Sequence, residues 1–66
     1  MKIILNGSEL MLAANSTLQD LIESQGLSGK RLAAEVNLNI IPKAEHAGFL
    51  LNDQDKVEIV HAIGGG

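Results

Sequence analysis

The three glycines at the end of the sequence are the residues whose type and position best fit chemistry. Gly64, Gly65 and Gly66 follow directly on an apolar run. A segment without side chains can enter a narrow channel and adopt backbone angles that other residues avoid. From Ile63 to Gly66, an extended tail would reach roughly 13 Å. We expect a flexible tail whose Gly66 carboxylate is activated, by adenylation with ATP, and then modified by partner enzymes; the alternative is an inert, disordered end.

The remaining polar residues form no catalytic set. The fragment at residues 26–30, Gly-Leu-Ser-Gly-Lys, differs from a P-loop because its glycine spacing is two residues too short. Neither His46 nor His61 has a second ligand at the spacing of a metal site. Asp53 and Asp55 fit a turn better than a cation site. We therefore predict no catalytic residue, no bound cofactor and no metal, so that the protein is a substrate of other enzymes.

The residues just before the glycines are candidates for contact with those enzymes. Val60 and Ala62 are predicted to face away from the core, and Ile63 adjoins the tail, so aliphatic side chains would form a docking patch. Packing within a small sheet is the alternative for these side chains. His61 ends the predicted strand and is either a partly exposed strand-end residue or a further partner contact.

Length and composition limit the classes of function. A chain of 66 residues with 45% apolar residues has room for one domain with a thin core. The net charge of -3 and the single aromatic residue, Phe49, argue against binding of nucleic acid or an anionic membrane. Cysteine is absent, so the chain cannot carry sulfur on a thiol, and a reducing cytoplasm is the expected compartment.

The first half of the sequence predicts a hairpin followed by a helix. Strands at 2–5 and 8–12 flank Asn6-Gly7, a pair that favours a tight turn with positive φ at both positions. A helix over 17–25 is predicted with Ser16 as its N-cap and Gln19 completing a capping box. Gly26 is the expected left-handed residue that ends the helix, which would fold Leu27 back onto Ile22.

The second half predicts further strands. Residues 31–36 alternate in a way typical of a strand with one buried face, 40–41 form a short edge strand closed by Pro42, and 43–48 form a polar connection. The last strand is predicted at 56–62, with Val57 and Ile59 facing the core. This order predicts an α+β fold of the β-grasp (ubiquitin-like) type, a mixed sheet of four to five strands with one main helix on one face. Residues 1–63 would form the domain, and 64–66 the tail.

Motifs along the whole chain carry a family resemblance. They are Lys-Ile-Ile-Leu-Asn-Gly at 2–7, Ser-Thr-Leu-Gln-Asp-Leu at 16–21, Val-Asn at 36–37, Ile-Ile-Pro-Lys at 40–43 and the stretch 55–66. With these motifs the chain resembles the ThiS family, the sulfur carrier proteins of bacterial thiamine biosynthesis. A terminal Gly-Gly is shared with the small subunit of molybdopterin synthase and with ubiquitin-like modifiers, so the combination of motifs is what favours ThiS. Lys43 stands where an arginine is common in the family.

The resemblance implies a mechanism. A ThiF-type enzyme would use ATP and magnesium to adenylate Gly66, a cysteine desulfurase persulfide would supply sulfur to form a thiocarboxylate, and the thiazole synthase ThiG would receive it. Three alternatives remain at this point: a sulfur carrier for molybdopterin or another pathway, a ubiquitin-like protein modifier, and a β-grasp binding module with an inert tail.

Overall fold

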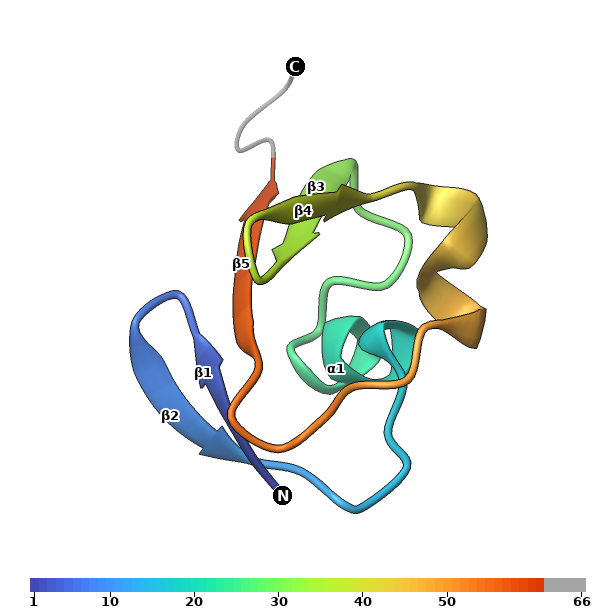
Figure 1. The fold of residues 1–66 in the computed structure, drawn as a ribbon. Helices are drawn as coiled ribbons and strands as arrows, with labels where there is room; N and C mark the ends of the chain where they lie inside the picture. The colour runs from blue at the N-terminus through green and yellow to red at the C-terminus, as the bar shows by residue number, and fades with distance from the viewer. Residues whose placement is uncertain (62–66) are drawn as a thin grey trace.

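A computed structural model describes residues 1–61, which form one mixed sheet with a helix on one face (Figure 1). The sheet order is β2-β1-β5-β3-β4, in which β1 and β5 are parallel and the other neighbours antiparallel. This confirms the predicted β-grasp architecture. The elements are β1 (Lys2–Leu5), β2 (Ser8–Met11), α1 (Leu18–Ser24), β3 (Leu32–Val36), β4 (Asn39–Ile41), the 3-10 helix η1 (Lys43–Gly48) and β5 (Lys56–His61).

The predicted strands that lie wholly within residues 1–61 are found to within one residue at each end, and the last strand begins at Lys56 as predicted. Its predicted end at Ala62, the predicted domain boundary at 63 and the tail at 64–66 lie outside the described residues and stay predictions. Within residues 1–61, no helix has the length and apolar character needed to cross a membrane.

The hairpin turn between β1 and β2 has the predicted geometry. Asn6 has φ +48° and Gly7 has φ +85°, so both central positions are left-handed, as the twist of a two-residue hairpin requires. The register pairs Leu5 with Ser8 and Ile3 with Leu10. That register places Ile3, which is fully buried, on the face that packs against α1.

The N-terminus of α1 differs from the prediction by one residue. Thr17, not Ser16, is the N-cap: its hydroxyl accepts a hydrogen bond from the Asp20 N–H at 3.0 Å, and the Asp20 carboxylate accepts one from the Thr17 N–H at 2.9 Å. The chain is still extended at this point, because the Ser16 carbonyl accepts the Leu51 N–H at 3.0 Å. The negative charge of the Asp20 carboxylate also interacts favourably with the positive end of the helix dipole, and the uncharged Gln19 side chain cannot make this interaction.

The C-terminus of α1 ends as predicted. Gly26 has φ +71°, its N–H donates to Glu23 O at 3.0 Å, and the Leu27 N–H donates to Ile22 O at 3.1 Å. These two bonds are the Schellman pattern, which satisfies carbonyl groups that the helix end leaves free. Leu27 therefore folds back onto Ile22.

The core lies between α1 and the sheet. Its side chains come from α1 and from alternate positions of the strands, and full burial of each large one contributes about 1.5–3 kcal/mol. In the segment 49–51, which follows η1, Leu51 is buried and Phe49 packs against the core, whereas Leu50 is 57% exposed. The core residues are Ile3, Leu18, Leu21, Ile22, Ala34, Val36, Ile41, Leu51, Val57 and Ile59.

Candidate functional site

The candidate site is the end of β5, the strand that leads to the predicted glycine tail. β5 lies in the interior of the sheet, hydrogen-bonded to β1 on one side and β3 on the other. The pairing with β1 covers the start of β5, at Lys56 and Val57, whereas Val60 and His61 at its end pair with Ala33 and Leu32 of β3. Ala62, Ile63, Gly64, Gly65 and Gly66, all predicted to take part in function, lie outside the described residues.

The hairpin turn also holds β5. The parallel pairing of β1 with β5 joins Ile4 to Lys56 and Leu5 to Val57. Beyond the end of β1, the Asn6 side chain continues the contact: its Oδ1 accepts the Ile59 N–H at 2.9 Å, and its Nδ2 donates to Ile59 O at 3.2 Å. The prediction from sequence assigned Asn6 only to the turn. No local signal reveals this second role, because the two residues are 53 positions apart.

The outer face of the sheet, opposite α1, is the exposed surface next to this strand end. Val57 and Ile59 are buried in the core, whereas Val60 is 72% exposed. The prediction that Val60 faces away from the core is therefore confirmed, and its role in partner contact stays a prediction. We define the outer face by residues paired in register across β4, β3 and β5: Ile40, Glu35, Ala33, Glu58 and Val60.

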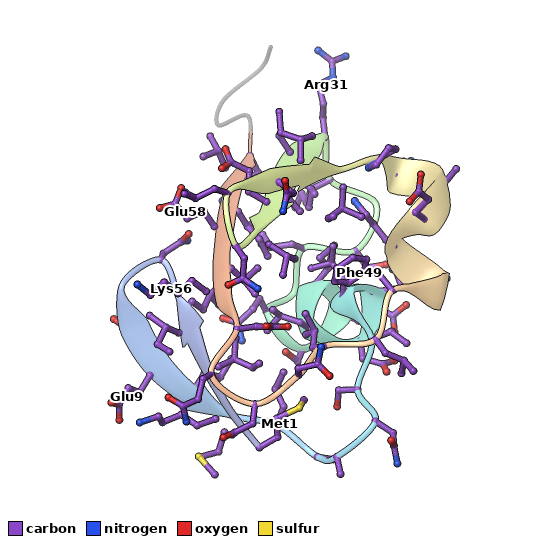
Figure 2. The ribbon with its side chains drawn as sticks, viewed as in Figure 1. Met1, Glu9, Arg31, Phe49, Lys56 and Glu58 are labelled. Carbon is purple, nitrogen blue, oxygen red and sulfur yellow. The ribbon has the colours of Figure 1, made fainter. Side chains whose placement is uncertain are left out.

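Two carboxylates of the outer face are cross-strand partners. Glu35 of β3 pairs directly with Glu58 of β5. Figure 2 shows Glu58 on the side of β5 away from α1. Like charges at directly opposed positions of a sheet are destabilising. This pair lies between exposed Val60 and Ile40, so the face has two neighbouring carboxylates beside exposed aliphatic side chains.

His61 lies at the other face of the strand end. It is half-buried, pairs in register with Leu32, and follows Val57 and Ile59 in the alternation toward the helix side. Its Nδ1 is buried and has no hydrogen-bond partner among residues 1–61. The half-buried position agrees with a strand-end residue, and its contact with a partner stays a prediction.

The other polar residues named from the sequence stabilise the fold. Asp53 accepts the Lys2 N–H at 2.6 Å, and this bond, with a weaker contribution from Gln54, lowers the pKa of the Asp53 carboxyl below its usual value. Asp55 accepts hydrogen bonds from the Asn52 N–H and the Asn37 amide. The bond from Asn52 places Asp55 in a turn, as predicted, whereas Asp53 joins the 52–55 segment to Lys2 of β1, 51 residues away, a contact that the sequence did not indicate.

His46, the other histidine, is a residue of η1 whose side chain is buried. It is 3% exposed, and its Nε2 donates to the Ile41 carbonyl at 2.8 Å. In the described part of the chain, no three His, Cys, Asp or Glu side chains lie together as a metal ion would require.

A family model for ThiS matches residues 2–66. The chain belongs to the ThiS family. One relative is the sulfur carrier protein ThiS of Bacillus subtilis, 40% identical over 63 residues, which are 94% of this chain and 96% of that protein. The crystal structure of ThiS from Geobacter metallireducens superposes with a TM-score of 0.83 over all of both chains at 20% identity, which shows the shared fold.

Two further relatives of this ThiS-family chain are much longer. A thiazole synthase of Paramagnetospirillum magneticum is 42% identical over 66 residues, and one of Magnetococcus marinus is 35% identical over 66 residues. Each match covers the whole of this chain but only 20% of the thiazole synthase. A segment similar to this chain therefore forms about a fifth of each of these two thiazole synthases.

Proposed function

We propose that this protein is the sulfur carrier for formation of the thiamine thiazole, and that sulfur travels on the carboxyl carbon of Gly66. The observation that carries the proposal is the match to the ThiS family over residues 2–66, which includes all three terminal glycines. The 40% identity to a sulfur carrier protein along 96% of its length supports the same role. The protein acts here as a cosubstrate and has no catalytic residues of its own.

The chemistry needs Gly66 to carry the C-terminal carboxylate. A ThiF-type enzyme with ATP and magnesium joins this carboxylate to AMP and releases pyrophosphate. The terminal sulfur of a persulfide, formed by a cysteine desulfurase, attacks the acyl carbon, and AMP leaves with the bonding electrons. A thiol then cleaves the S–S bond of the acyl disulfide, which leaves the thiocarboxylate and a protein disulfide.

Thiazole synthase of the ThiG type is the proposed receiver of the sulfur. Support comes from the two thiazole synthases in which a segment like this chain makes up 20% of the protein. Carriage on the main-chain terminus also agrees with the absence of cysteine from the sequence.

The outer face is the proposed docking surface for these enzymes. Val60 lies one residue from the end of the described strand, so an enzyme that contacts Val60 is placed to receive the residues that follow. The exposed Val60 and Ile40 offer apolar area, and the Glu35–Glu58 pair is complementary to a basic side chain. A cation placed between the two carboxylates would relieve their repulsion, so binding would recover stability that the free domain lacks.

Adenylation can be tested separately from sulfur transfer. The full chain is mixed with a ThiF-type enzyme, magnesium, ATP and labelled pyrophosphate, and exchange of label into ATP is measured. We expect exchange that depends on this protein and that stops when one Ala is added after Gly66. Exchange that persists with the extended chain would contradict activation at the Gly66 carboxylate.

A further inference from the structure

A groove on the helix side of the protein carries a concentration of positive charge. It has a volume of about 450 Å³ and lies between α1, the loop that precedes β3, and η1. Its floor is largely apolar, formed by Ile22, Leu27 and Leu32 together with the buried imidazole of His46. Its rim is basic: Lys30 and Arg31 come from the loop, and Lys43 comes from the start of η1.

The charge of the groove is opposite to that of the whole protein. The chain has five basic residues and a net charge of -3, yet three of the five line this groove. The only ion pair among residues 1–61 joins Lys2 to Glu9, far from the groove in sequence, so Lys30, Arg31 and Lys43 are unpaired within that range. Three neighbouring cations without carboxylate partners repel one another, and a bound anion would remove that repulsion.

The acidic residues nearest in sequence do not neutralise the rim. Glu23 follows Gln19 on α1 and accepts a hydrogen bond from its amide at 3.0 Å, and Glu45 lies on η1. Neither approaches a rim cation within 4.0 Å, the limit for an ion pair. Gln19 is itself part of the groove, so the α1 wall presents an amide.

Backbone geometry fixes the position of the rim. The Schellman turn at Gly26 directs the chain back along α1, and a second left-handed glycine, Gly29 with φ +78°, turns it toward β3. The Lys30 N–H donates to Leu27 O at 3.0 Å and closes this turn. Figure 2 shows Arg31 at the end of the molecule where β3 begins, extending away from the body of the domain.

We propose that this groove binds a small organic molecule that carries a phosphate group. Arg31 can make two parallel hydrogen bonds to phosphate oxygens, and the two lysines add charge. The apolar floor would cover the uncharged body of the ligand. A volume of about 450 Å³ lies within the usual range for small-molecule sites, about 300–1,000 Å³. This inference does not depend on the sulfur carrier role.

Titration of the 15N-labelled full chain with ADP tests the proposal, because the backbone amide signal of each residue other than proline reports on contacts near that residue. We expect ADP to shift the signals of Lys30, Arg31, Leu32 and Lys43. Pyrophosphate should shift the rim signals alone, and adenosine, which has the same ring without the phosphates, should shift none of them. Raising the salt concentration should weaken the binding of ADP, because screening acts on exposed charges.

Two double variants that lose the same amount of charge distinguish binding of ADP in the groove from non-specific attraction of ADP to positive charge on the protein. K30Q/K43Q removes two rim charges, and K2Q/K56Q removes two charges elsewhere. We expect the first to weaken ADP binding by about fivefold or more and the second by less than about twofold. Equal weakening by both variants, or the absence of groove shifts with ADP, would overturn the proposal. A third result would also overturn the proposal: the natural chain does not bind ADP, and K30Q/K43Q no longer binds the activating enzyme. The groove would then be a contact surface for that enzyme.

Discussion

The side chain of Asn6 forms two hydrogen bonds with the backbone of Ile59, one as acceptor at 2.9 Å and one as donor at 3.2 Å. Asn6 also has φ +48°, a conformation that asparagine tolerates better than most residues. One residue thus closes the first hairpin and extends the parallel contact along the last strand. The link therefore joins the first hairpin to Ile59, two residues before the end of β5.

Asn6→Ala should therefore destabilise the protein more than a matched change elsewhere. Asn15 is the control, because it also has positive φ, +68°, but its side chain makes no hydrogen bond within residues 1–61. Both alanine variants pay the cost of the left-handed backbone, and only Asn6→Ala loses two hydrogen bonds. We expect the difference in free energy of unfolding to be about 1–3 kcal/mol. Equal destabilisation in urea titrations would show that the two hydrogen bonds contribute nothing.

The helix cap gives a second prediction. Thr17→Ala should lower the free energy of unfolding by about 0.5–2 kcal/mol, because it removes the acceptor for the Asp20 N–H. Ser16→Ala should change it by less than about 0.5 kcal/mol, since the Ser16 hydroxyl donates only to the exposed turn at Ala13. Thermal unfolding of the two variants checks this, and a larger loss for Ser16→Ala would restore Ser16 as the cap.

The shift of the cap shows where reading the sequence succeeds and where it stops. Ser16 with Gln19 and Thr17 with Asp20 fit the capping pattern almost equally well. The choice is made by the distant segment at 50–51, which pairs with Thr17 and Ser16 and keeps the chain extended for one more residue. The Asn6-Gly7 turn and the end of the helix at Gly26 were predicted because their causes are local.

Some features of the candidate site also have local causes and could be predicted, whereas others depend on contacts between distant segments. Exposure of Val60 follows from the alternation of side chains along one strand, so the sequence predicted it. The opposition of Glu35 and Glu58, and the groove shared by Lys30 and Lys43, depend on registers and packing between distant segments. The Lys30-Arg31 pair was visible in the sequence, but nothing local indicated that η1 would bring Lys43 beside it.

The Glu35–Glu58 pair should be measurable as a repulsion. In a double-mutant cycle with Glu35→Gln and Glu58→Gln, each single variant should raise the free energy of unfolding by about 0.2–1 kcal/mol, and the double variant should gain less than the sum. Glu9→Gln is the control and should not stabilise the protein, because Glu9 pairs with Lys2 at 3.3 Å. Additive single effects would mean that the two carboxylates do not interact.

The outer face should affect partner binding without affecting the fold. Val60→Ser should raise the concentration of this protein needed for half-maximal activity of the ThiF-type enzyme, while the melting temperature changes little, because Val60 is 72% exposed. Met11→Ser is a matched control: Met11 is 70% exposed and lies on β2, opposite Lys2 at the far end of the sheet. Equal effects of the two variants on the enzyme assay would remove Val60 from the docking surface.

Sulfur on Gly66 is the central claim, and the mass of the intact protein tests it most directly. The chain is incubated with the ThiF-type enzyme, ATP, magnesium and a persulfide source, then weighed and fragmented. The predicted result is a gain equal to the exchange of one oxygen for one sulfur, located on Gly66 and lost again when thiazole synthase and its substrates are added. An unchanged mass, or a chain joined to lysine side chains through Gly66, would contradict the role of sulfur carrier.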